Sequence, residues 1–200
     1  MNPPDRSGQV REGAQQEAGI PREIMTEILG VYALPLDGVH GAAHWGRVLE
    51  TGRRLAATTG ADRAVLTLFA VFHDARRLSE GADPDHGRRG ADLALRLGPR
   101  LGLTPAQLAQ LAFACAHHAD GLTEGDVTVR TCWDADRLDL WRVGLTPQRG
   151  LLCTEAARAA EIRRWCRVRS LEDHRPDCAR EWLRMAASRA RRESDGRRGS

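Results

Sequence analysis

The sequence lacks lysine altogether and contains few aromatic residues. All 30 basic residues are arginine, and they stand against 27 acidic residues, so the net charge is only +3. This balance does not indicate a polymeric nucleic acid as partner, because nucleic-acid-binding proteins usually show a clustered basic face. Aromatic residues make up 4% of the chain, which disfavours an aromatic-rich sheet, whereas hydrophobic residues make up 42% and can build a substantial core.

Segments for export or for membrane insertion are also missing. The N-terminal sequence MNPPDRSGQVREGAQQ has no apolar core, so it is not a secretory signal. No apolar run approaches the ~18 residues that a membrane span needs. The five cysteines are scattered without a CxxC pair, which favours small buried side chains in a reducing compartment over disulfides. We therefore expect a cytoplasmic protein with no membrane partner.

The two ends of the chain differ in composition from its middle. Residues 1–20 are polar and contain proline, glycine and glutamine, which predicts a disordered N-terminal arm. Residues 187–200 predict a frayed, basic and flexible tail. A chain of 200 residues is typical of one domain, and we expect that domain to span residues 21–186.

Apolar residues recur at helical spacing through this middle region, and no segment alternates convincingly as a strand would. The fold is therefore predicted to be all-α. Residues 61–73 are apolar nearly all round, which predicts a central buried helix. Thr104, Pro105 and Gln107 supply an N-cap, a first-turn proline and a capping-box glutamine for a helix that ends near residue 118. Further helices are predicted at residues 21–29, 41–58, 86–97, 132–142, 154–167 and 176–187.

Histidine and aspartate form the pattern that carries chemistry. Six of the seven histidines fall between His40 and His118. His73 and Asp74 stand together at the end of the apolar helix, where an ionised carboxylate is costly unless it is paired or bound to metal. A capped helix end explains one His-Asp pair at least as often, so the pair alone is weak evidence. Imidazole and carboxylate ligands together suit Mn, Fe, Co, Ni or Zn, whereas Mg prefers oxygen ligands alone.

The order of these residues resembles that of the HD superfamily of metal-dependent phosphohydrolases. His44 lies in HWGRV, His73 and Asp74 lie in VFHDARR, and Asp136 lies in WDADRLDL, which together read H…HD…D. The resemblance implies an all-helical bundle that forms a single HD domain. It also implies that His44, His73, Asp74 and Asp136 bind a first divalent metal ion.

Further segments resemble the two-metal members of this superfamily, such as the HD-GYP proteins. His86 opens HGRRGADLA, and His117 and His118 open HHADG, in the order that those relatives use. The resemblance implies that Asp74 bridges to a second ion held by His86 and by His117, His118 or both. No GYP tripeptide follows, so cleavage of a cyclic dinucleotide is doubtful.

The resemblance implies one or two divalent ions per chain, with His73 and Asp74 at the catalytic centre. A metal-activated water would hydrolyse a small phosphorylated metabolite or nucleotide. The same six-ligand set also occurs in HD-fold mixed-valent di-iron oxygenases, which remain the alternative function. Iron content and an oxygen-dependent reaction would separate the two. A non-catalytic binding module is disfavoured because the ligand set is complete, and the sequence does not specify the oligomeric state.

Two assignments depend on helix geometry. Asp134 and Asp136 are two residues apart, so on a helix they face nearly opposite ways. Asp136 shares a face with Trp133 and Leu140 and is preferred as the ligand. We expect Asp139 to lie at the surface or to support a ligand.

Three further residues are candidates for substrate binding. His40 lies four residues before His44 and on its face if the helix has begun, so it contacts the substrate, supports a ligand or adds another ligand. Arg76 and Arg77 directly follow the His-Asp pair, and a planar guanidinium forks onto phosphate oxygens. Salt bridges would explain these arginines equally well, since three acidic residues follow closely: Glu80, Asp83 and Asp85.

Overall fold

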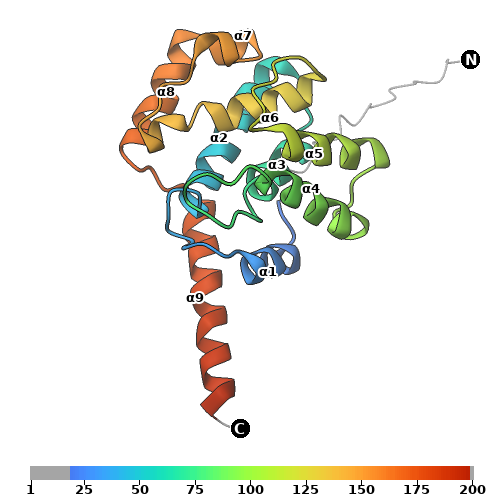
Figure 1. Ribbon diagram of the computed structural model, residues 1–200, viewed down its shortest axis with the longest axis vertical. Coiled ribbons are helices and arrows are strands. Elements are labelled where there is room, and N and C mark those ends of the chain that lie inside the picture. The colour runs from blue at the N-terminus through green and yellow to red at the C-terminus, as the bar shows by residue number, and fades with distance from the viewer. Residues whose placement is uncertain (1–18, 199–200) are drawn as a thin grey trace, which may run out of the picture.

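The computed structural model describes residues 19–198, and this region is built from helices joined by loops (Figure 1). The all-α fold is confirmed, since no strand occurs between residues 19 and 198. Residues 1–18, which carry most of the predicted disordered arm, lie outside the described residues. The α-helices are α1 Arg22–Val31, α2 Ala42–Thr59, α3 Arg63–Phe72, α4 His86–Leu97, α5 Pro105–His117, α6 Val127–Arg137, α7 Glu155–Arg158, α8 Ala160–Leu171 and α9 Asp177–Arg198. Short 3-10 turns occur at η1 Gly98–Arg100, η2 Leu140–Val143 and η3 Arg149–Leu151.

Helix α3 lies at the centre of the bundle, as its apolar sequence predicts. Residues 65–72 are all buried, and α2, α5 and α6 pack around them. Asp62 caps the helix, because its carboxylate accepts hydrogen bonds from the amides of Ala64 and Val65. The C-terminal end of this buried helix therefore delivers the His-Asp pair to the interior of the protein.

Large aromatic side chains fill the core around α3. Trp45, Phe69, Phe72 and Trp133 are almost completely buried. Each such burial stabilises the fold by roughly 1.5–3 kcal/mol. A second, smaller apolar cluster joins α2 to η2, α7 and α8, and it consists of Leu55, Leu138, Trp141, Leu152, Ala157, Ile162 and Cys166. The two clusters hold α6 and the turn after it in place between them.

Helix ends agree with the sequence where capping chemistry is strong. The capping box of Thr104 and Gln107 is present, and α4 begins at His86 as predicted. The helix predicted over residues 132–142 is wrong at both ends. Helix α6 already begins at Val127, where Asp126 accepts a hydrogen bond from the Thr128 amide at 2.8 Å. It ends at Arg137, and the 3-10 turn η2 follows as a separate element.

The C-terminal third differs from the prediction in two places. The helix predicted over residues 154–167 is divided into α7 and α8, because Ala159 between them has an extended backbone. Helix α9 continues through residues 187–198, for which the sequence predicted a frayed tail, and this stretch extends beyond the other helices (Figure 1). Alanine and arginine, both good helix formers, are frequent there. None of the described helices combines the length and the apolarity needed to cross a membrane.

Candidate metal centre

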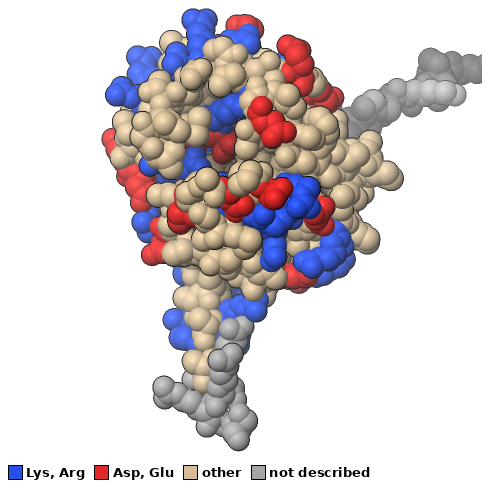
Figure 2. Space-filling view, viewed as in Figure 1, with Lys and Arg blue, Asp and Glu red and all other residues tan. Residues whose placement is uncertain are grey.

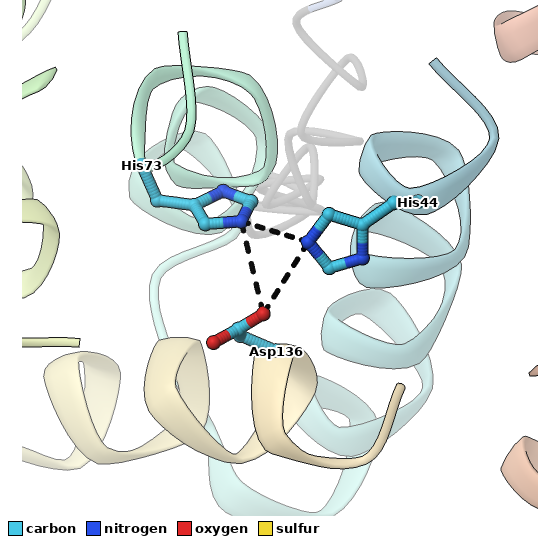
Figure 3. A group of neighbouring side chains, drawn as sticks. All are labelled: His44, His73 and Asp136. Atoms are coloured by element: carbon cyan, nitrogen blue, oxygen red, sulfur yellow. Dashed lines mark hydrogen bonds and ion pairs between the residues drawn. The ribbon is translucent and has the colours of Figure 1, made fainter. Parts of the chain in front are cut away.

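Three helices bring His44, His73 and Asp136 to one point. His44 lies in the first turn of α2, His73 follows the last residue of α3, and Asp136 lies in the last turn of α6. The Nε2 atoms of the two histidines are 3.0 Å apart, and they lie 3.4 and 3.7 Å from Oδ1 of Asp136 (Figure 3). These three side chains form the first group.

A second group consists of Asp74, His86 and His118. Asp74 follows α3, His86 opens α4, and His118 closes α5. The Nε2 atoms of the two histidines are 2.8 Å apart, and they lie 3.4 and 3.9 Å from Oδ1 of Asp74. All three side chains are buried. In both groups the ligand atoms lie within 4.8 Å of one another.

Asp74 lies between the two groups. Its Oδ1 faces the second group, while its Oδ2 lies 3.7 Å from Nε2 of both His44 and His73. Burial by itself raises the pKa of Asp74, but the imidazoles of His73, His44 and His118 hold it below its ordinary value. The carboxylate is therefore ionised and has one oxygen on each side, which is the arrangement that a bridging ligand needs.

The hydrogen bonds of the four histidines determine where their protons lie. Each Nδ1 faces an oxygen: a carboxylate for His44, and a backbone carbonyl for His73, His86 and His118. These acceptors are Asp139 Oδ2 at 2.8 Å, Phe69 O at 3.0 Å, Asp83 O, and Cys115 O at 2.7 Å. Because a carbonyl or carboxylate oxygen accepts, each Nδ1 carries a proton and each Nε2 of a neutral ring presents a lone pair.

These lone pairs face one another, and this fits a cation in each group. Two unprotonated nitrogens only 2.8 or 3.0 Å apart repel unless a positive charge lies between them. Ligands bound at ~2.1 Å to a tetrahedral ion lie about 3.4 Å apart, close to the separations in both groups. Burial lowers the pKa of His73 to about 3 and also lowers that of His86, so both rings are neutral near pH 7, as metal binding requires.

Asp139 supports His44 from outside the first group. The carboxylate is buried and accepts hydrogen bonds from His44 Nδ1 at 2.8 Å and Arg47 Nε at 2.8 Å. Ser170 donates to it at 2.5 Å. Burial raises the pKa of Asp139, but the hydrogen bond from His44 contributes most to lowering it to about 2. Of the two expectations for this residue, a place at the surface is wrong, because Asp139 is buried against His44.

Asp134 points away from both groups, as the helix geometry predicts, but it is not a surface residue. Its carboxylate is fully buried and accepts hydrogen bonds from the amides of Cys153 and Thr154, at 2.6 and 2.8 Å, and from the Thr154 hydroxyl at 2.7 Å. Burial raises its pKa above the ordinary value. Asp134 therefore anchors the segment that leads into α7, whereas Asp136 faces the first group.

A cavity of about 530 Å³ opens over the two groups. Asp74, His86, His118 and Asp136 all contribute to its lining. Other parts of the wall are apolar and come from the segment that follows α6, namely Leu140, Val143, Leu145, Pro147 and Leu151. Figure 2 shows that basic and acidic side chains are interspersed on one face of the molecule, without a large area of one sign.

Two of the predicted substrate-binding residues, His40 and Arg77, line this cavity. His40 Nδ1 lies 2.5 Å from Oε2 of Glu80. Burial lowers the pKa of His40, although the hydrogen bond to Glu80 opposes this. Arg77 Nη1 lies 3.1 Å from His86 Nε2 and 3.5 Å from Asp74 Oδ1.

The other two uncertain residues lie apart from the cavity. Arg76 donates a hydrogen bond to the Val31 carbonyl at 3.1 Å and lines a separate surface hollow, which argues against substrate contact. His117 Nδ1 lies 2.7 Å from Asp120 Oδ2, and its side chain is 38% exposed. Successive residues of a helix point about 100° apart, so only one of the neighbouring pair His117 and His118 faces Asp74.

Two arginines of the cavity, Arg142 and Arg137, were not assigned a role from the sequence. Arg142 lines the cavity beside His40, and Arg137 lines it beside Leu151. Arginine is so frequent in this chain that position in the sequence carries no signal for either residue.

Comparison with known proteins agrees with this fold. No family model matches the chain. A crystal structure of a predicted HD superfamily hydrolase from an uncultured Thermotogales bacterium matches with a TM-score of 0.58 and 27% sequence identity, over 76% of this chain and 87% of that chain. The bifunctional uridylyltransferase/uridylyl-removing enzyme of Rhodospirillum rubrum is 36% identical over 80 residues, which cover 36% of this chain and 8% of that enzyme. The chain has the fold of that predicted HD superfamily hydrolase, and both comparisons support its resemblance to the HD superfamily.

Proposed function

We propose that the protein is a metal-dependent phosphohydrolase that acts on a small phosphorylated metabolite or nucleotide. The observation that carries the proposal is the arrangement of four imidazoles whose Nε2 atoms converge in two pairs. A buried, ionised carboxylate, Asp74, lies between the two pairs. Such a set favours a bound cation, because the paired Nε2 atoms face each other without a donor between them and Arg77 reaches only His86 and one oxygen of Asp74.

The chain offers two neighbouring positions for divalent ions. The first ion would be held by His44, His73, Asp136 and Oδ2 of Asp74, and the second by Oδ1 of Asp74 with His86 and His118. When bound, divalent ions of this kind polarise a phosphoryl group and lower the pKa of a bound water, from ~15.7 towards ~7 in the zinc case. The donor set suits Mn, Fe, Co, Ni or Zn.

Arg77 is suited to bind the phosphoryl group. Its guanidinium donates towards the Nε2 lone pair of His86 and towards Asp74, so it competes with a cation at the second group. The backbone carbonyls of Ser79 and Gly81 hold Nε and Nη2 of Arg77 independently of the second group. With a cation at that group, Nη1 would be available to a phosphate oxygen at the edge of the cavity.

His40 is suited to bind the other side of the scissile bond. Glu80 accepts a hydrogen bond from Nδ1 of His40, which orients the ring and leaves Nε2 available in the cavity that His40 lines. A hydroxyl or leaving oxygen of the substrate can hydrogen-bond to this nitrogen. His40 and Arg77 thus supply one polar contact each to the two ends of the reacting group.

A phosphate-release assay with two aspartate variants tests the proposal. Chelator-treated protein is reloaded with Mn, Fe, Co, Ni or Zn and screened against nucleotides and sugar phosphates. Asp74→Ala is expected to reduce metal-dependent turnover to background with little loss of helical circular dichroism, because both ions lose their shared ligand. Asp134→Ala is the matched control: it should retain activity but unfold with about 2–4 kcal/mol less stability, since three donors lose their acceptor.

The outcomes separate the possible errors. Full turnover in Asp74→Ala would refute the two-ion mechanism as a whole. Loss of activity in Asp134→Ala but not in Asp136→Ala would show that the wrong aspartate has been chosen. Oxygen consumption by the iron-loaded protein, with no phosphate release from any substrate, would instead support the di-iron oxygenase alternative.

A further inference from the structure

Three arginines line the cavity, and two of them have a carboxylate nearby. Arg77 lies 3.5 Å from Asp74, and Nε of Arg142 lies 3.8 Å from Asp139. For Arg137 no carboxylate lies within ion-pair distance among residues 19–198. Arginine keeps its charge in proteins, so Arg137 is a cation without a counter-ion at the wall of the cavity.

The guanidinium of Arg137 is also poorly satisfied in hydrogen bonds. The residue is only 7% exposed. Nη1 donates to the Leu151 carbonyl at 2.6 Å and to the Cys153 thiol at 3.3 Å, but Nη2 is buried without a partner in the described structure. The carbon of the guanidinium lies 5.7 Å from the centre of the Trp133 ring, which supports the charge only weakly. A buried, unpaired charge is costly, so an anion that reaches this side chain is bound strongly.

The carboxylates of the cavity do not neutralise Arg137. The lining contains three of them, Asp74, Glu80 and Asp136. Glu80 is paired with His40, and Asp74 and Asp136 face the two histidine groups. Leu151, whose carbonyl Arg137 contacts, belongs to the apolar part of the cavity wall. The carboxylates of the lining thus supply no counter-ion to Arg137, which leaves a ligand as the source of an anion.

We infer that Arg137 binds a second oxyanion of the substrate, a carboxylate or a phosphate, at a distance from the scissile phosphoryl group. The part of the substrate between the two anions lies along the apolar wall formed by Leu140, Val143, Leu145, Pro147 and Leu151. The class of substrate is thus a phosphate ester with an additional anionic group, rather than a singly phosphorylated neutral molecule. This inference depends on the proposed function in one respect only, namely that the group to be cleaved is a phosphate ester.

Binding of non-hydrolysable phosphonates tests this inference without requiring turnover. Isothermal titration of the manganese-loaded protein compares phenylphosphonate with its 3- and 4-carboxy derivatives and with 1,3- and 1,4-phenylenediphosphonate. At least one probe with a second anionic group should bind about tenfold or more tightly than phenylphosphonate, as a charge-assisted hydrogen-bonded pair provides. The carboxylate and phosphonate arms show which oxyanion Arg137 prefers.

Variants then assign the preference to the side chain. Arg137→Met should lower the affinity of the probes with a second anionic group to that of phenylphosphonate. The affinity for phenylphosphonate should stay within about threefold of the wild-type value. Arg137→Lys retains the charge but loses the planar fork, so part of the preference should remain. Arg88→Met removes an arginine of α4 whose side chain is 62% exposed, and it should keep the full preference. Thermal unfolding establishes that each variant is folded.

Several results would overturn the inference. Equal affinity of the wild type for all five probes would show that no second oxyanion is bound. Equal weakening of all probes by Arg137→Met would show that Arg137 only supports the Leu151 segment or contacts the phosphoryl group. One further result separates this inference from the proposed function. If probes with a second anionic group bind more tightly only when Arg137 is present, but no ester releases phosphate, the inference is supported and the proposed hydrolysis is rejected.

Discussion

At the residue scale, Asp139 decides which nitrogen of His44 faces the first group. The carboxylate accepts a hydrogen bond from Nδ1 of His44 and further hydrogen bonds from Arg47 and Ser170. A carboxylate behind a histidine ligand fixes the ring and makes its free nitrogen more basic. Asp139 would therefore support the proposed ligand His44 without being a ligand itself.

Replacing Asp139 should weaken the first metal position. In Asp139→Asn the manganese affinity of the first group is expected to fall by roughly 10–100-fold, because the histidine loses its anionic acceptor. Calorimetric titration with Mn²⁺ measures this change. Asp173→Asn is the matched control, since Asp173 contacts the same Arg47 at 3.2 Å but its side chain is 58% exposed. Wild-type affinity in Asp139→Asn would show that His44 needs no such support.

At the element scale, two glycines allow α4 to deliver His86 to Asp74. A Cβ atom at Gly87 would lie 2.5 Å from the Cys115 carbonyl, and one at Gly90 would lie 2.3 Å from the Phe72 carbonyl. These carbonyls belong to the last turns of α5 and α3, the elements that carry His118 and the His-Asp pair. The three helices thus approach backbone to backbone, and this close packing assembles the second group.

A methyl group at Gly90 should disrupt this approach. Alanine favours a helix interior by about 1 kcal/mol over glycine, but the contact with the Phe72 backbone cannot relax without moving α4. We expect Gly90→Ala to lose about 1–3 kcal/mol of stability and to weaken the second manganese site more than the first. Thermal unfolding and manganese titration measure the two effects.

Gly150→Ala provides the comparison for Gly90→Ala. A Cβ atom at Gly150 meets no atom within 4 Å, so its stability and both manganese affinities should stay close to wild type. If Gly90→Ala instead proved more stable than wild type, helix propensity would dominate and α4 would not depend on close packing.

At the scale of the whole molecule, the proposed ligands connect most of the bundle. They come from α2, from the ends of α3 and α5, from the first turn of α4 and from the last turn of α6. The unfolded chain does not hold these side chains together, so metal binding would stabilise the folded state. Binding and folding are therefore expected to be coupled.

Metal removal should lower the unfolding temperature. With Mn²⁺ at about 100 times its dissociation constant, one site contributes about 2.7 kcal/mol, which corresponds to roughly 5–11 °C for a chain of this size. Differential scanning calorimetry before and after chelation measures the shift. Asp74→Ala should show almost none of it, because both positions lose their shared ligand. An equal shift in Asp74→Ala would place the stabilising ion elsewhere on the protein.

The sequence by itself determined the fold class, the resemblance to the HD superfamily and the order of the candidate ligand residues along the chain. Helical spacing of apolar residues predicted the bundle, and the fully apolar stretch predicted that α3 is central. The H…HD…D order predicted the HD superfamily, which the comparisons support. These features depend on local periodicity and on motif order, which are properties of the chain alone. The metal ligands themselves remain a prediction.

Only the tertiary structure decided between neighbouring residues. Local sequence does not show whether His117 or His118, or Arg76 or Arg77, faces the cavity, because helix ends rotate about their axes until their apolar faces pack. The start of α6 at Val127 could not be predicted for a related reason. Its first turn is rich in β-branched residues, which become helical here only when the turn is capped and packed. The lack of a counter-ion for Arg137 likewise depends on which segments meet there. Such choices follow from packing across the whole bundle, which no local pattern encodes.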